Sequence, residues 1–206
     1  MKRIKVMTSS FENTRKKSTI NVPASYKDYI IDQIVYDYNN TKSRENSLLP
    51  FTKQKIPKVM EWYENSGYEY YLWIDPKIIL EDGFLESIVD YADTNITDLL
   101  LFSHPERSSV KEEIDFIFDE NRNPEYRSYD GEMLKEQLEK YFSDNGFIDH
   151  QLFYTGLFMY SGRLVQNRDF NMMGDWFMHC ILYHINDQLW LPYLLSKHNV
   201  NYKVYG

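Results

Sequence analysis

Asp75 is the residue whose setting most clearly predicts chemistry. It directly follows YYLWI at 70–74, a continuous apolar run typical of a central strand buried on both faces. A carboxylate at the carboxyl end of such a strand lies on the edge of an α/β sheet where ligands bind. There it could hold Mn²⁺ or Mg²⁺, which in turn would bind a diphosphate. On this pattern alone, a loop-capping Asp beside the turn-forming Pro76 is an equally good interpretation.

Two other segments place polar side chains at the ends of predicted elements. Asp187 and Gln188 open a predicted helix, where the carboxylate could act as a base on an acceptor hydroxyl or stabilise an oxocarbenium-like centre. The plain alternative is that Asp187 is an N-cap. His104 and Arg107 follow a predicted strand and could pair with phosphates or sugar hydroxyls. An ordinary exposed loop would look the same, and the histidines have no zinc-type spacing.

The elements that must position these groups alternate along the chain. Strands are predicted at 4–8, 29–38, 70–74, 98–102, 152–160 and 202–205, and helices at 56–63, 84–91, 108–118, 131–141, 175–184 and 187–197, with a polar loop at 39–46. This alternation predicts an α/β fold with a single, mainly parallel sheet flanked by helices. A length of 206 residues suits one domain over 1–206, which could be part of a longer chain.

Composition narrows the class of partner. The net charge of −8 argues against a nucleic-acid-binding protein, whose surface needs a basic footprint. A group of lysines and arginines in the first 60 residues fits a local phosphate site instead. The single cysteine, Cys180, excludes an intrachain disulfide and is expected to be a buried thiol. No apolar run is typical of a signal peptide or long enough to span a membrane, so a cytoplasmic protein is expected.

Four segments, taken in order, resemble the TOD/MUCI-type glycosyltransferase-like domains. They are KIPK at 55–58, YLWIDPK at 71–77, QLEKY at 137–141 followed by Gly146, and Trp176 followed by DQL at 187–189. Together they span about residues 44 to 195. The resemblance implies a GT-A fold and a metal-dependent transfer of sugar from a UDP-sugar to a glycan or glycoprotein acceptor. The chain departs from the family at Pro76, where glycine is usual, and at Lys77, which leaves Asp75 as the only acid of the usual DxD motif.

The resemblance also implies roles for individual residues. Asp75 would hold Mn²⁺ or Mg²⁺, and Asp187 would be the catalytic carboxylate. Donor binding would fall to Thr8, Ser9, Asp37, Arg44, Lys55, Lys77, His104 and Arg107, and the sugar and acceptor side to Trp176 and Gln188. The alternatives are a non-catalytic nucleotide-sugar or glycan-binding module with a degraded DxD, and a purely structural protein. A nucleotidyltransferase is disfavoured because no glycine-rich loop follows the first predicted strand.

Overall fold

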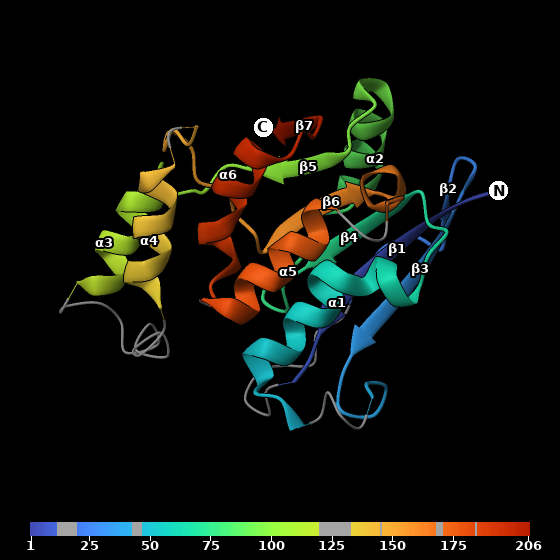
Figure 1. Cartoon of the computed structure of the whole chain (residues 1–206). Helices are drawn as coiled ribbons and strands as arrows, with labels where there is room; N and C mark the ends of the chain where they lie inside the picture. The colour runs from blue at the N-terminus through green and yellow to red at the C-terminus, as the bar shows by residue number, and fades with distance from the viewer. Residues whose placement is uncertain (12–19, 43–46, 120–132, 145, 168–170, 184) are drawn as a thin grey trace.

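The computed structural model describes residues 1–11, 20–42, 47–119, 133–144, 146–167, 171–183 and 185–206 (Figure 1). Seven strands form one sheet in the order β2-β3-β1-β4-β6-β5-β7. The strands are β1 (Lys2–Ser9), β2 (Ser25–Tyr26), β3 (Tyr29–Tyr36), β4 (Tyr70–Ile74), β5 (Leu99–Phe102), β6 (Leu157–Ser161) and β7 (Tyr202–Tyr205). The helices are α1 (Pro50–Glu64), α2 (Phe84–Asn95), α3 (Val110–Phe118), α4 (Leu134–Ser143), α5 (Met172–Leu182) and α6 (Asp187–Lys197), with a 3-10 turn, η3 (Gly162–Val165).

The protein therefore has an α/β fold, but its sheet is mixed, and the prediction of a mainly parallel sheet was wrong. β1 runs parallel to β3 and β4, and β5 runs parallel to β7. β6, however, is antiparallel to both β4 and β5, and β2 is antiparallel to β3. The reversal of β6 accompanies the placement of α3 and α4, which stand beside one end of the sheet instead of crossing its face (Figure 1). The chain consequently starts β6 at the same end of the sheet at which β5 finishes, and β6 runs antiparallel to β5.

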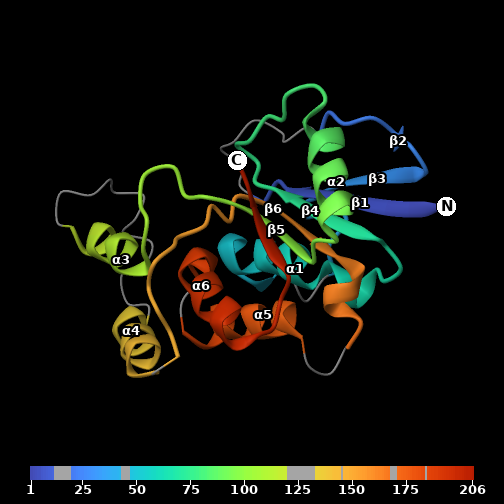
Figure 2. The same ribbon diagram turned by 90° about the horizontal axis from the view of Figure 1, so that it is seen from above.

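Helices cover both faces of this sheet, as the sequence predicted. Figure 2 shows α2 on one face and α1, α5 and α6 on the other. Two apolar clusters correspond to the two faces: one joins α2 to the sheet and the other joins α1, α5 and α6 to it. In the described part of the chain, no helix is long and apolar enough to cross a membrane.

The alternation of side chains along β4 explains how it orients Asp75. Tyr70, Leu72 and Ile74 belong to the cluster beneath α2, whereas Tyr71 and Trp73 belong to the cluster beneath α1. All five residues are buried, so both faces of this strand are covered. Because the period of a strand is two, the residue after Ile74 continues on the side of Trp73. Asp75 is thereby turned toward α1.

Helix α1 is longer than predicted and supplies the other half of the site. It begins at Pro50, six residues before the predicted start, because proline is well suited to the first position of a helix. Pro57 lies inside it, and the helix continues to Glu64. Helix α4 is described from Leu134, so residues 131 and 132 of its predicted span lie outside the described residues.

Candidate functional site

Asp75 is held at the end of β4 by backbone and side-chain bonds. Its N–H donates to the carbonyl of Gly156 over 2.7 Å, and its own carbonyl accepts from Ile78 N–H over 2.9 Å, which closes a turn. The indole Nε1–H of Trp73 donates to Asp75 Oδ1 over 2.7 Å. The other carboxylate oxygen makes no hydrogen bond or ion pair with the described residues. About a quarter of the side chain is exposed (26%), so Asp75 has one oxygen fixed and one available.

Lysine side chains from α1 join Asp75 to Asp187. Lys58 Nζ lies 2.6 Å from Asp187 Oδ2 and 3.7 Å from Asp75 Oδ1. Lys55 Nζ lies 3.1 Å from the same Asp187 oxygen. Positions three apart on a helix share a face, which is why both lysines reach one carboxylate. We call these four charged side chains the edge cluster: Lys55, Lys58, Asp75 and Asp187. It contains two lysines and two aspartates.

Asp187 is the buried centre of the edge cluster. Its Oδ1 accepts from the hydroxyl of Thr155 over 3.0 Å, whereas its Oδ2 is held only by the ion pairs with the two lysines. Its backbone carbonyl accepts from Trp176 Nε1–H over 2.8 Å, which ties α6 to α5. The N-cap of α6 is Asn186, whose side chain accepts from Gln188 N–H over 3.1 Å. The interpretation of Asp187 as the N-cap was therefore wrong by one residue. Its carboxylate forms ion pairs with Lys55 and Lys58 instead.

The charges of the edge cluster set its protonation. Burial alone would raise the pKa of Asp187, but the charges of Lys55 and Lys58 outweigh it and lower the pKa to about 2. Burial likewise opposes the charged form of Lys55, yet the neighbouring carboxylate of Asp187 raises its pKa above the usual value. The pair formed by Asp187 and Lys55 is thus ionised at neutral pH. A carboxylate with so low a pKa is a weak base.

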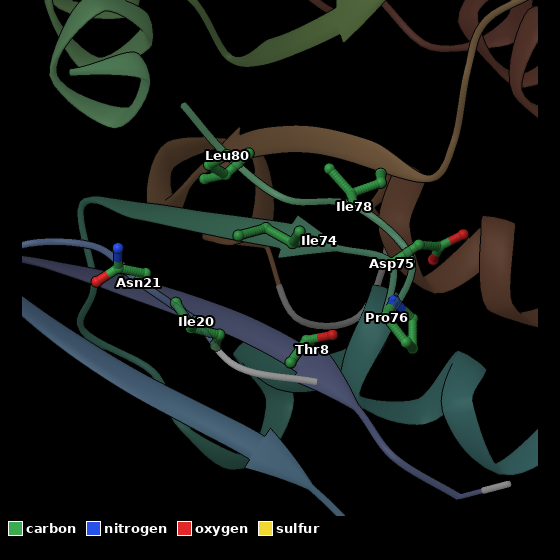
Figure 3. A pocket seen from close by; sticks show the side chains of 8 residues that line it. All are labelled: Thr8, Ile20, Asn21, Ile74, Asp75, Pro76, Ile78 and Leu80. Atoms are coloured by element: carbon green, nitrogen blue, oxygen red, sulfur yellow. The ribbon is translucent and has the colours of Figure 1, made fainter. Parts of the chain in front are cut away.

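A small pocket adjoins Asp75 on the face covered by α2 (Figure 3). Its interior offers about 20 Å³, room for one or two water molecules, so it is a shallow hollow compared with the ~300–1,000 Å³ typical of ligand sites. Its walls are Thr8, Ile20, Asn21, Ile74, Asp75, Pro76, Ile78 and Leu80. Thr8 is buried, and its hydroxyl has no hydrogen-bond partner among the described residues. In Figure 3 the Asp75 carboxylate points away from Thr8, so pocket and edge cluster lie on either side of the strand end.

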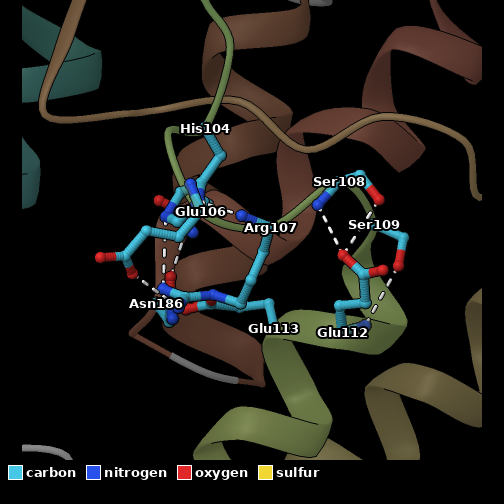
Figure 4. Close-up of polar contacts among 9 residues, drawn as sticks. His104, Glu106, Arg107, Ser108, Ser109, Glu112, Glu113 and Asn186 are labelled. Carbon is cyan, nitrogen blue, oxygen red and sulfur yellow. Dashed lines mark hydrogen bonds and ion pairs between the residues drawn. The ribbon is translucent and has the colours of Figure 1, made fainter.

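His104 and Arg107 form a closed polar network in the loop between β5 and α3 (Figure 4). His104 Nδ1 accepts from the backbone N–H groups of Glu106 and Arg107, over 3.2 and 3.0 Å. The Arg107 guanidinium pairs with Glu113 and Glu106 and lies 4.2 Å from the centre of the Phe116 ring. Burial, and then the charge of Arg107, lowers the pKa of His104. The donors of Arg107 thus already bind carboxylates of its own segment.

Residues 152–156 connect this network to the edge cluster. His104 N–H donates to Leu152 O over 3.0 Å, and the rings of His104 and Tyr154 are 6.5 Å apart. Thr155 and Gly156 then contact Asp187 and Asp75 as described above. Burial, and after it the charge of Asp75, raises the pKa of Tyr154. A Cβ on Gly156 would lie only 2.7 Å from the Tyr154 ring, so this position needs glycine for the ring to pack there.

The remaining predicted residues are more scattered. Ser9 is buried and, being adjacent to Thr8 in β1, points to the opposite face. The Asp37 side chain accepts from the N–H of Asn39 over 2.8 Å and stabilises the turn after β3. Lys77 is exposed, whereas Trp176 is fully buried and presents no surface to a sugar. Gln188 is half-buried. Arg44 lies outside the described residues.

Sequence reasoning counted Lys58 only as one of a basic group that fits a phosphate site, and it assigned no role to Tyr154 or Thr155. Lys58 carried a usable signal, because it lies one helical turn from Lys55 and shares its face. Tyr154 and Thr155 carried none, since they fall in what was predicted as the interior of a strand. The structure gives residues 152–156 an irregular path with a single bridge, between Ser103 and Phe153. Their proximity to both carboxylates depends on that path.

The expected Mn²⁺ or Mg²⁺ can be compared with the donors present. Among the described residues, no group of three or more His, Cys, Asp or Glu side chains could hold a metal ion. Asp75 Oδ2 is one suitable oxygen, and Mg²⁺ is often bound by one or two carboxylates together with substrate phosphates. The residues therefore fit a divalent cation that a bound diphosphate helps to hold. Asp75 would be its protein ligand.

Comparison with known proteins leaves the family open. No protein-family model matches the chain, and no curated protein matches it significantly. The resemblance to TOD/MUCI-type domains thus rests on the four short segments alone. Three of these segments contribute to the site: 55–58 supplies both lysines, 71–77 supplies Asp75, and the last supplies Trp176 and Asp187.

Proposed function

We propose that this protein is a GT-A-type glycosyltransferase that moves a sugar from a nucleotide-diphosphate donor, with UDP as the nucleotide, to a glycan or glycoprotein acceptor. The observation that carries the proposal is the edge cluster, in which Lys58 joins the carboxylates of Asp75 and Asp187 at the ligand-binding edge of the sheet. Asp75 offers an open carboxylate oxygen to a cation, and the positive charge of Lys58 lies buried directly behind it.

In this proposal the nucleoside part of the donor binds over the mouth of the pocket beside Asp75. Its walls are mainly aliphatic, with polar groups from Thr8 and Asn21. A buried hydroxyl without a partner is uncommon in native proteins, because leaving it unpaired costs about 1–3 kcal/mol. A polar atom of the ligand would satisfy Thr8. The diphosphate would then pass over Asp75 toward Lys58 and its α1 neighbours.

In the transfer, the bond between the anomeric carbon and the diphosphate oxygen breaks and the diphosphate leaves with the electron pair. The acceptor hydroxyl bonds to the anomeric carbon and gives its proton to a general base. A divalent cation bound between Asp75 and the phosphates would stabilise the leaving group. Lys58, close to both carboxylates, holds Asp75 in place and adds positive charge at the same edge.

The second candidate is a non-catalytic nucleotide-sugar-binding module, and the setting of Asp187 favours it. Asp187 was predicted to be the catalytic carboxylate, yet it is buried, is held by Thr155 and both lysines, and has a pKa of about 2. In this arrangement it is the counter-ion of two lysines. A binding module keeps donor affinity without turnover, which separates it from a transferase.

Calorimetry with UDP and Mn²⁺ tests the proposed function. We expect wild-type protein to bind UDP in the presence of Mn²⁺, and Asp75→Ala to lose that binding while remaining folded. Asp115→Ala is the matched control, because Asp115 is an exposed acid of α3 whose one ion pair among the described residues is with Lys111. Undiminished binding by Asp75→Ala would refute the site. Incubation with a panel of UDP-sugars then separates the candidates, since a transferase slowly releases UDP and a binding module does not.

A further inference from the structure

The charge balance of the edge cluster bears on how a cation could bind there. The side chains of Lys55, Lys58 and Asp187 are only 7%, 3% and 6% exposed, so water screens their interactions poorly. Their charges and that of Asp75 sum to zero. A divalent cation added at Asp75 would give the buried edge cluster a net charge of +2. This imbalance opposes the binding of a free cation.

Lys58 is the member of the cluster that opposes the cation most directly. Its ammonium lies 3.7 Å from Asp75 Oδ1, and a cation on Oδ2 would sit on the other oxygen of the same carboxylate. Like charges at such a separation repel strongly where the surroundings are mostly protein. Trp73 fixes Oδ1 through its indole N–H, so the carboxylate is not free to turn away from Lys58.

We propose that Lys58 makes divalent-cation binding at Asp75 depend on a bound nucleoside diphosphate. The proposal rests on the proposed function and specifies how that site assembles. A diphosphate brings two to three negative charges, which offset the added cation and also supply the oxygen ligands that Asp75 alone lacks. The cation and the diphosphate consequently bind together, each raising the affinity of the protein for the other by the same factor.

The chain offers a variant that separates Lys58 from the rest of the cluster. Lys58→Met keeps the length of the side chain and removes its charge, and it leaves Lys55 and Asp187 as a balanced pair at 3.1 Å. Asp75 then becomes an uncompensated carboxylate, which favours a free cation. Lys53→Met is the matched control, because Lys53 is another buried lysine of α1 whose ammonium lies over the ring of Tyr38 at 4.1 Å.

The test measures Mn²⁺ binding directly by electron paramagnetic resonance, with and without UDP, and requires no turnover. We expect wild-type protein and Lys53→Met to bind Mn²⁺ at least about tenfold more tightly with UDP than without it. Lys58→Met should bind Mn²⁺ alone at least about tenfold more tightly than wild type does. Adding Asp75→Asn to Lys58→Met should abolish this gain, which would locate the cation at Asp75.

Two results would overturn the proposal. One is equal Mn²⁺ affinity of the wild-type protein with and without UDP, in a sample that calorimetry shows to bind UDP. The other is equal affinity of wild type and Lys58→Met for Mn²⁺ alone. Failure of the proposed function looks different, because wild-type protein would then bind no UDP at any Mn²⁺ concentration. A gain of Mn²⁺ binding by Lys58→Met would still show that Lys58 opposes the cation.

Discussion

Substitution of Asp187 by asparagine distinguishes a structural carboxylate from a catalytic one. In the structure, Asp187 is the only acidic side chain within ion-pair distance of Lys55 among the described residues. The Asp187→Asn variant keeps the shape of the side chain but leaves Lys55 charged, buried and without a counter-ion. Lys58 would retain Asp75 at 3.7 Å. The main cost therefore falls on one buried ammonium.

The expected loss can be worked from this geometry. Removing one partner of a buried ion pair destabilises a protein by about 3–5 kcal/mol, because the remaining charge is left desolvated. In a domain of this size each kcal/mol lowers the melting temperature by about 2–4 °C, so a fall of roughly 6–20 °C is expected. By contrast, Thr155→Val removes only the hydroxyl that bonds Asp187 Oδ1, and should cost about 1.5–3 kcal/mol.

Urea and thermal unfolding, followed by circular dichroism, measure these losses. The double variant Asp187→Asn with Lys55→Met removes the unpaired charge as well, and we expect it to be more stable than Asp187→Asn alone. A single Asp187→Asn variant within about 1 kcal/mol of wild type would refute the counter-ion role. If that variant also kept its affinity for UDP and lost turnover, Asp187 would be the catalytic base that the sequence predicted.

Two further predictions concern His179 and Thr8. Burial, the largest influence, lowers the pKa of His179 to about 4, so between about pH 6.5 and 4 the unfolded chain binds a proton that the folded protein does not. Stability should therefore fall as the pH falls through this window, and His179→Gln should flatten the decline in melting temperature; parallel curves would contradict the effect. Thr8→Val should leave stability unchanged or slightly raised, because the buried hydroxyl has no partner, and should weaken UDP binding about fivefold by calorimetry. Unchanged UDP affinity would exclude Thr8 from the site.

Local sequence patterns predicted the elements that carry the site, but not how the chain connects them. The strand at 70–74 and the helix at 187–197 were predicted to the residue, because an apolar run and an Asn-Asp helix start are local signals. The direction of β6 was not, since it depends on where α3 and α4 pack. The same limit applied to Asp187: its position at a helix start was visible, whereas its burial against two lysines of α1 depends on contacts between distant segments.

The edge cluster is difficult to explain by stability alone. Replacing a buried ion pair by well-packed apolar side chains is often neutral or stabilising, so two lysines and a buried aspartate gain little for the fold. Structural ion pairs also tend to be closed, with each oxygen satisfied inside the protein. Here the carboxylate of Asp187 is held by Thr155 and both lysines. Asp75, by contrast, keeps one oxygen available at the carboxyl end of its strand, next to a pocket that contains the unpaired hydroxyl of Thr8. Under the proposed function, this open oxygen is the place where a cation with its charged ligand would bind.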